Sequence, residues 1–232
     1  MAPIDPRNQS PFHALPPVVV ALAVVILGIE ALFQLGALGL IGGQASVGWR
    51  LGALQDWSVA EAVWDWMWQT RQAPPGEVAR LLAYPLLHGS LLHAGFAAVF
   101  ILAFGNAIAP YYPTWRFLLI FFGASVDGAL AYLLLFEAQA PLYGGMPGAY
   151  GLIGAFAFLT QRGLTRADPS KAFLLLGFLL AIQPVFGILT LQGLSWVPLW
   201  SAEFVGAATG YAIAMALFPG GLTGLRDRLR QR

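Results

Sequence analysis

Few side chains in this sequence can do chemistry, and most of them lie in otherwise apolar segments. They are Glu30, Asp127, Gln183 and Glu203, together with His88 and His93, which lie at the mouth of an apolar run. Imidazoles combined with a carboxylate could bind a metal ion or carry a proton. An imidazole within reach of a serine hydroxyl could instead catalyse acyl transfer. For Glu30, Asp127 and Gln183, hydrogen bonds that position helices are the simpler interpretation, because none lies in a recognisable cluster.

The composition indicates what surrounds these groups. Of the 232 residues, 58% are hydrophobic and 10% are charged, and the mean hydropathy is +0.70. A soluble domain carries about 25% charged residues, so this chain is expected to span a lipid bilayer several times. The absence of cysteine excludes disulfides and thiolate metal sites. Neither a cofactor nor nucleic acid is expected as a partner.

The elements that must position the polar groups are apolar helices. A membrane span needs roughly 20 mostly apolar residues, and ionisable residues within one mark candidate sites. Six segments are predicted to span, at residues 18–40, 91–109, 117–136, 142–159, 172–191 and 197–218. The sequence therefore predicts an all-α membrane domain over residues 18–218. A cytoplasmic segment (1–17) precedes it and a basic cytoplasmic tail (219–232) follows it.

The basic residues predict the orientation. With both termini in the cytoplasm, nine of the twelve lysines and arginines are inside, and only Arg50, Arg71 and Arg80 are outside. Cytoplasmic loops of membrane proteins carry such an excess of positive charge. The long loop at residues 41–80 is then on the outer side. We expect the chain to reside in a bacterial cytoplasmic (inner) membrane.

The outer loop carries a tryptophan pattern. Trp57, Trp64 and Trp68 are spaced by seven and four residues, which would place them on one stripe of a helix. Tryptophan favours the membrane–water interface, so an interfacial helix is predicted here. A tryptophan-rich loop folded onto the bundle is the alternative.

The residues from Arg80 to Ile108 resemble the second-span region of the rhomboid intramembrane serine proteases. That family has an arginine, an aromatic–proline pair and two histidines five residues apart, followed by a glycine near the end of the span. The matching residues here are Arg80, Tyr84, His88, His93 and Gly105. The resemblance implies a six-helix bundle with a long outer first loop and cytoplasmic termini.

Two further stretches resemble the same family. "GLIGAFAF" (151–158) is similar to its fourth span, and "SAEFVGAATG" (201–210) is similar to its sixth. Gly206 and Gly210 occupy the glycine positions of the sixth span, and small residues four apart let helices pack closely. The family brings its second and sixth spans together, so we expect Glu203 to pair with His88 or His93.

The positions that carry catalysis in rhomboids differ here. The family has a Gly-x-Ser-Gly run at the head of the fourth span, and the matching run here reads Gly145, Met146, Pro147, Gly148. This match places Pro147 at the nucleophile position, whereas counting back from Gly154 places Met146 there. Glu203 stands at the position of the general-base histidine, and Ala97 at that of the asparagine that helps to bind the oxyanion. Neither Met146 nor Pro147 can attack a carbonyl carbon.

No other serine is an obvious substitute. Ser90 is expected to cap a helix, Ser125 lies inside the third span, and Ser201 points away from Glu203 on a helix that turns about 100° per residue. The resemblance therefore implies a rhomboid-like pseudoprotease that binds other membrane proteins or their transmembrane segments without cleaving them.

Two alternatives are open. The first is an active rhomboid-family serine endopeptidase with a non-standard site. The second is a metal or proton site built from His88, His93 and Glu203. Because His88 and His93 are five residues apart, both could face one ion only if His88 precedes the helix.

Overall fold

The computed structural model describes residues 15–136, 140–165, 167–190 and 193–219. The predicted terminal segments 1–17 and 219–232 lie almost wholly outside these residues. The described part consists of helices and the turns between them, with one isolated antiparallel bridge between Val59 and Leu142. The longer helices are α1 (Pro17–Ala37), α5 (Leu91–Ile108), α6 (Thr114–Leu135), α7 (Met146–Gln161), α8 (Pro169–Leu189) and α9 (Val197–Leu217). The shorter ones are η2 (Gly43–Gly48), α2 (Trp49–Trp57), α3 (Glu61–Thr70), α4 (Pro75–Ala83), η3 (Tyr84–Leu86) and η4 (Ala109–Tyr111).

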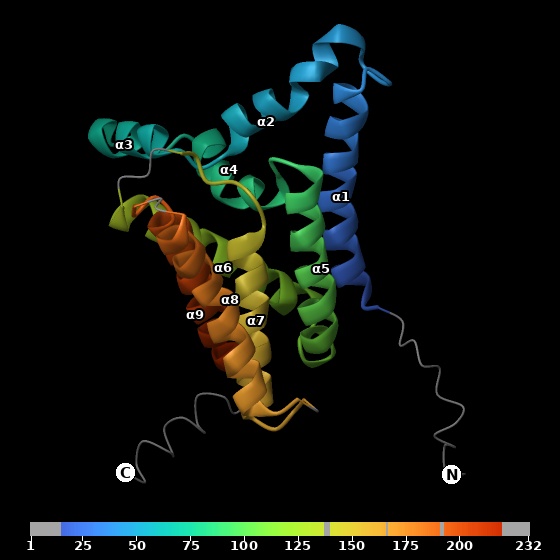
Figure 1. The fold of residues 1–232 in the computed structure, drawn as a ribbon, viewed down its shortest axis with the longest axis vertical. Helices are drawn as coiled ribbons and strands as arrows, with labels where there is room; N and C mark the ends of the chain where they lie inside the picture. Colours follow the sequence, from blue (N-terminus) through green and yellow to red (C-terminus); the bar gives the residue numbers. More distant parts are fainter. Residues whose placement is uncertain (1–14, 137–139, 166, 191–192, 220–232) are drawn as a thin grey trace.

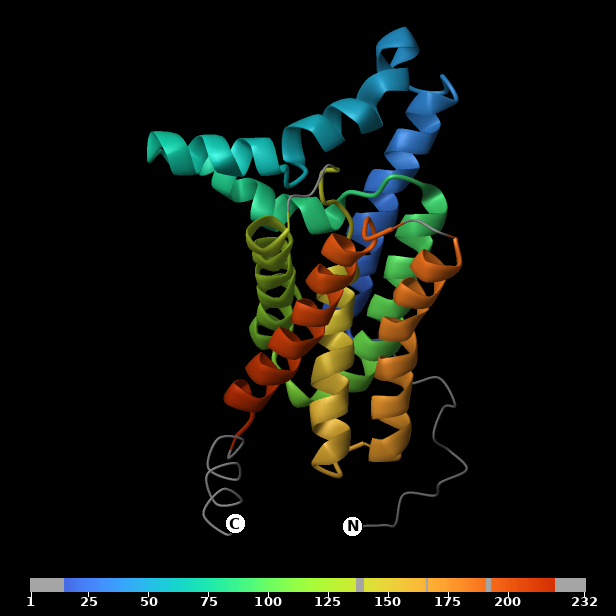
Figure 2. The same ribbon diagram turned by 60° about the vertical axis from the view of Figure 1, so that its left-hand side comes forward.

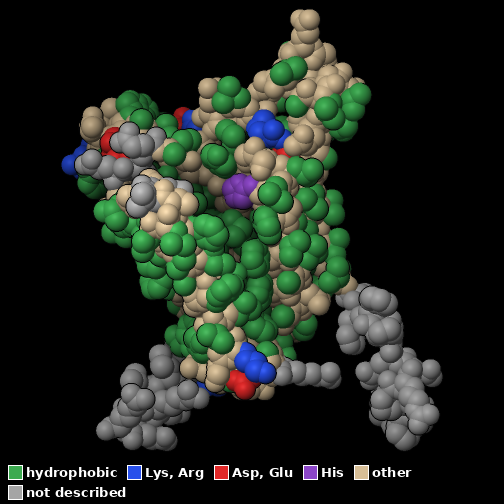
Figure 3. Space-filling model, viewed as in Figure 1, with side chains coloured by type: hydrophobic (Ala, Val, Ile, Leu, Met, Phe, Trp, Pro, Cys, Tyr) green, Lys and Arg blue, Asp and Glu red, His purple; other side chains and the backbone are tan. Residues whose placement is uncertain are grey.

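The longer helices form one bundle (Figures 1 and 2). Four of its segments are long and apolar enough to cross a membrane, namely α1, α5 with η4, α6 and α8. Helix α7, with 16 residues, and α9 are not in that set, but both run alongside the others in the bundle. Hydrophobic side chains cover the visible side of the bundle (Figure 3). The prediction of an all-helical chain with apolar, membrane-suited helices is confirmed.

Helix α7 lies at the centre of the bundle, in contact with α5, α6, α8 and α9. Nearly all of its residues are buried. Its contact with α9 depends on glycine, because a methyl group on Gly206 would overlap the Pro147 carbonyl oxygen and one on Gly210 would overlap that of Gly151. The predicted close packing of a helix through these two glycines is confirmed.

The helix predicted over residues 142–159 begins four residues later, at Met146. Leu142 is held in an extended conformation because its N–H and carbonyl group both pair with Val59. Gly144 then adopts a φ of +103°, which side-chain-bearing residues rarely adopt. The apolar character of these residues thus reflects packing against the neighbouring segment and not helix formation.

Residues 43–83, which we call the arm, lie across one end of the bundle (Figures 1 and 2). The predicted single stripe of Trp57, Trp64 and Trp68 is wrong, because α2 ends at Trp57 and α3 begins at Glu61. The bridge at Val59 interrupts the helix between them. Trp64 packs on a buried cluster of the bundle and the arm, whereas Trp68 is 67% exposed.

Helix α8 contains Pro184, which cannot donate a backbone hydrogen bond to the Leu180 carbonyl. The indole Nε1–H of Trp200, on α9, donates to that carbonyl at 2.7 Å. The Tyr150 hydroxyl, on α7, donates to the neighbouring Leu179 carbonyl at 3.2 Å. The Trp200 side chain of α9 therefore satisfies the carbonyl group that the proline leaves unpaired within an apolar helix, and Tyr150 ties the adjacent carbonyl to α7.

Candidate functional site

The two histidines lie together where the chain enters α5. His88 precedes the helix and His93 lies in its first turn, and the centroids of their rings are 4.9 Å apart in an edge-to-face arrangement. The Gly145 backbone N–H donates to His88 Nε2 at 3.2 Å. A side chain on Gly144 would collide with the ring of His93. The glycines before α7 therefore let the backbone approach both imidazoles.

His88 is almost completely buried, at 1% exposure. Burial, together with the neighbouring His93, lowers its pKa from 6.5 to about 4, although a contact with the Leu86 backbone partly offsets both effects. Its Nδ1 has no hydrogen-bond partner with suitable geometry. Because Nε2 accepts the bond from Gly145, His88 serves to hold the start of α7 against the segment before α5.

Acid should therefore destabilise the folded protein through His88. Its folded pKa is below its unfolded value, so stability is fully present above pH 6.5 and is lost as the pH falls towards 4. A shift of this size is worth about 3 kcal/mol at the acid end. Thermal unfolding of the purified protein between pH 7.5 and 4 should show the loss, and His88→Gln should reduce it. An equal loss in His88→Gln would assign the acid sensitivity to other groups.

The first two residues of α7 have different surroundings. Met146 lines a cavity of about 1040 Å³ beneath the arm. Pro147 is buried, and its Cβ lies against Gly128 of α6 while its carbonyl faces Gly206 of α9. Of the two positions that the sequence leaves open for a nucleophile, Met146 is the one whose residue faces the cavity.

The cavity is bounded by the arm, α6, the residues before α7 and the start of α9. Its lining includes His93, Tyr143, Met146, Leu199 and Glu203, and the carboxylates Glu61 and Asp65 of α3. A histidine-coloured patch is visible in the hollow below the arm in Figure 3. A cavity of this volume is at the upper end of the range for small-molecule sites, and it is large enough to admit part of a polypeptide.

Glu203 lies in the wall of this cavity but is only 2% exposed. Its Oε2 accepts a hydrogen bond of 2.7 Å from Gln183 Nε2 of α8. The predicted pairing of Glu203 with His88 or His93 is therefore wrong. Gln183, one residue before Pro184 on α8, takes that place.

Glu203→Gln should be nearly neutral, within about 1 kcal/mol, because an amide oxygen can still accept the bond from Gln183. Glu203→Ala should cost about 1–3 kcal/mol, because it leaves the Gln183 amide without its acceptor. Thermal unfolding of the two variants in the same detergent compares these costs. If the glutamine variant is as unstable as the alanine variant, the site requires a charged carboxylate.

Ala97 lies one turn beyond His93 on α5 and is completely buried. Its methyl group offers no hydrogen bond to the cavity.

The three serines considered from the sequence are all hydrogen-bonded to nearby backbone groups. Ser90 Oγ accepts the His93 N–H at 3.2 Å, as the predicted helix cap. Ser125 Oγ donates to Phe121 O at 2.9 Å, and Ser201 Oγ donates to Pro198 O at 2.7 Å.

Two serines that the sequence did not single out, Ser58 and Ser195, line the cavity. Ser58 belongs to the arm and Ser195 to the segment before α9, so only the folded chain brings them to the same hollow.

The three residues of the metal alternative are not arranged as metal ligands. Within the described residues, no three His, Cys, Asp or Glu side chains are grouped closely enough to hold a metal ion, and this includes His88, His93 and Glu203.

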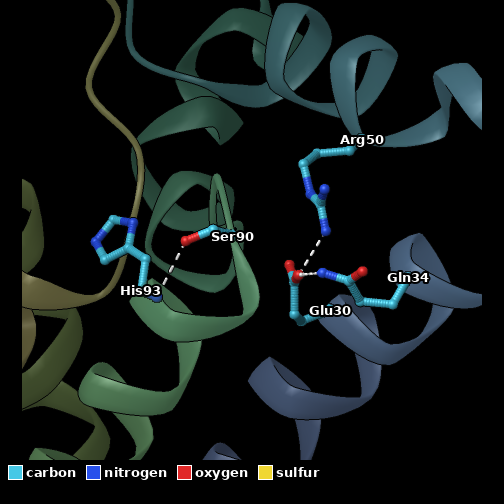
Figure 4. Close-up of polar contacts among 5 residues, drawn as sticks. All are labelled: Glu30, Gln34, Arg50, Ser90 and His93. Atoms are coloured by element: carbon cyan, nitrogen blue, oxygen red, sulfur yellow. Dashed lines mark hydrogen bonds and ion pairs between the residues drawn. The ribbon is translucent and has the colours of Figure 1, made fainter. Parts of the chain in front are cut away.

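A separate polar cluster ties the arm to α1 (Figure 4). Glu30 is 1% exposed, and its Oε1 accepts hydrogen bonds from Arg50 Nη2 at 2.5 Å and from Gln34 Nε2 at 2.8 Å. The ring of His93 points away from this cluster, towards the segment before α7. Glu30 thus holds the arm in place, as expected for a carboxylate that positions helices, and Arg50 is its ionic partner.

The chain matches a known protein family. The family model described as "Rhomboid domain" matches residues 75–220, from the start of α4 to beyond the end of α9. The match includes both histidines, the start of α7 and Glu203, whereas α1 and most of the arm lie outside it. No curated protein matches the sequence.

Proposed function

The chain belongs to the rhomboid family, and we propose that it is a membrane pseudoprotease that binds other membrane proteins or their transmembrane helices without cleaving them. The observation that carries this proposal is the residue at the start of α7. Met146 faces the cavity there, and a thioether cannot form the ester intermediate of a serine protease. A fold does not retain its activity when the residues of the site are replaced.

The surroundings of Met146 support the same proposal. Glu203 Oε2 is hydrogen-bonded to Gln183, and a carboxyl group at this position lacks the imidazole with which a serine protease moves the proton. Ala97 provides no donor for an oxyanion. The cavity has both apolar and polar walls. A cavity without these catalytic groups is suited to binding a polypeptide segment.

The proposal is tested by photocrosslinking in the native membrane. A photoreactive amino acid at Met146 should crosslink to membrane proteins whose segments remain intact. The same amino acid at Leu174, which is 72% exposed on α8 and does not line the cavity, is the matched control. The proposal predicts a discrete set of adducts from Met146 that Leu174 lacks. It is contradicted if the two positions give the same adducts, or if the captured proteins are cleaved.

The active-protease alternative rests on Ser58 and Ser195, which bring hydroxyl groups to the cavity. It predicts a cleaved partner and a covalent adduct with serine-directed reagents at one of these residues. Alanine variants of both serines would abolish such an adduct.

We further propose six membrane spans with both termini in the cytoplasm and the arm on the outer side. The support is the excess of basic residues, nine against three, on the side of the termini. A fluorescent protein fused after Arg232 should fluoresce, and an alkaline phosphatase fused there should be inactive. The reverse pattern, an active phosphatase and a dark fluorescent protein, would contradict this orientation.

A further inference from the structure

Asp127 is an acidic residue on the outside of the bundle. It lies in α6 and its side chain is exposed, in contrast to Glu30 and Glu203, which are buried. Leu134, two turns further along the same face, is 62% exposed. Asp127 also lies outside the lining of the cavity beneath the arm. It therefore belongs to a different surface from the candidate site.

The position of Asp127 along α6 places it at membrane depth. It is eight residues from the end of the helix at Leu135, which is about 12 Å along the axis. The apolar core of a bilayer is about 30 Å thick. Helix α6 is one of the four helices suited to crossing it. The carboxylate of Asp127 therefore faces the hydrocarbon region when the bundle stands alone in a bilayer.

One hydrogen bond within the protein satisfies part of the Asp127 carboxyl group. Thr209 Oγ1, on α9, donates to Asp127 Oδ2 at 3.0 Å. The acyl chains of lipids offer no hydrogen bond to the rest of the carboxyl group, in either protonation state. Polar groups in membrane helices are usually turned inwards or paired across a helix interface. An exposed carboxyl group at this depth indicates that another helix covers it.

The surface around Asp127 allows close approach of such a helix. Gly123, four residues before Asp127 on α6, is partly exposed, but Ile213 of α9 fills the place of its missing side chain, so the room for another helix lies on the α9 side of Asp127. On α9, Ala212 lies three residues after Thr209 and is exposed. Small residues at such positions are typical of contacts between membrane helices. Leu130, three residues after Asp127, is partly exposed and offers an apolar side chain for packing.

The negative charge of the Asp127 carboxylate indicates which kind of helix would dock on this face. A second copy of this chain cannot place a cation opposite Asp127, because the lysines and arginines of the described membrane helices lie near helix ends. Arg116 and Lys171 are each the third residue of their helix. A helix from another protein, with a lysine or arginine near the middle of its span, supplies both the opposite charge and several donors.

We propose that the face of α6 and α9 around Asp127 and Thr209 is a docking site for a transmembrane helix of another protein that carries a basic residue within its span. The site goes beyond the cavity-based binding proposed above and does not depend on it. It would select partners by an intramembrane charge and not by the sequence of a cleavage site.

The experiment uses the purified full-length protein in lipid vesicles with synthetic helices. The probe is a fluorescent leucine–alanine helix of about 20 residues, long enough to span the bilayer, with one lysine at its midpoint. The same helix with leucine in place of lysine is the control. Energy transfer to a labelled protein measures association. Differently labelled copies of the protein alone measure self-association.

The lysine helix should bind about five- to thirtyfold more tightly than the leucine helix, the range for one polar contact between membrane helices. Asp127→Asn should remove most of this preference. Asp56→Asn, a matched loss of an exposed carboxylate on α2 outside the cavity lining, should keep it.

Equal binding of the two helices would overturn the proposal, as would a full preference in Asp127→Asn. Self-association that Asp127→Asn abolishes would assign the face to a second copy instead, and would also contradict it. These outcomes are independent of the crosslinks from Met146, so failure here is distinguishable from failure of the pseudoprotease proposal.

Discussion

Gly210→Leu should prevent the chain from accumulating as a folded protein. A side chain at this position would overlap the carbonyl oxygen of Gly151, which belongs to the backbone of α7 and cannot rotate away. Helix α7 is enclosed by four other helices, so it has little room to shift. Overpacking of a core costs about 1–3 kcal/mol, and a clash with backbone at the centre of the bundle should reach or exceed the upper value.

Gly177→Leu is the matched control for this prediction. It makes the same change in α8, where no atom lies within 4 Å of the position of a new Cβ. Gly177→Leu should give a monodisperse protein with a melting temperature close to that of the unmodified protein, whereas Gly210→Leu should aggregate or melt far lower. Similar behaviour of the two variants would mean that α7 and α9 are not packed as described.

The second large effect concerns catalysis. Restoring serine alone, at Met146 or at Pro147, should give no measurable activity, because the general-base position holds Glu203, which lacks the imidazole that takes the proton and returns it to the leaving amine. Combining Met146→Ser with Glu203→His and Ala97→Asn should produce slow labelling by a fluorophosphonate. The loss of triad groups typically lowers turnover by about 10⁴–10⁶-fold, so the difference from the unmodified protein should be large.

The geometry at the start of α7 also predicts which serine variant a fluorophosphonate will label. Met146 faces the cavity, whereas Pro147 is packed against α6 and α9. The triple variant with Pro147→Ser in place of Met146→Ser should therefore remain unlabelled, although it carries the same three residue types. Folded yield must be checked first, because asparagine at the buried Ala97 adds volume to the core. Labelling of the Pro147→Ser variant alone would contradict the geometry.

The sequence predicts the bundle well wherever the signal is local. Apolar runs of sufficient length identify the long helices, and the spacing of Gly206 and Gly210 predicts the close contact of α9. Ser90 is recognisable as a helix cap, since it directly precedes the apolar run. Each of these features depends on neighbours within a few turns of one helix, and a single sequence contains that information.

Features that depend on distant segments were not predicted. The break between α2 and α3 arises from the pairing of Val59 with Leu142, which lies far along the chain. Glu203 is bonded to Gln183 and not to a histidine, because α8 is tied to α9 around Pro184. Pro184 could have indicated this contact between α8 and α9. The carbonyl that loses its helical donor to a proline requires another donor from a neighbouring helix. The spacing of Glu30 and Gln34 could similarly have indicated their bond.

Fluorophosphonate labelling of the unmodified protein tests the central claim most directly. The reagent requires an activated oxygen nucleophile, and the residue facing the cavity at the start of α7 is a methionine. The pseudoprotease account predicts no adduct under conditions that label a serine protease stoichiometrically, and no cleavage of transmembrane substrates in the same preparation. A stoichiometric adduct mapped to Ser58, Ser90, Ser125, Ser195 or Ser201 would contradict it and establish the chain as a protease.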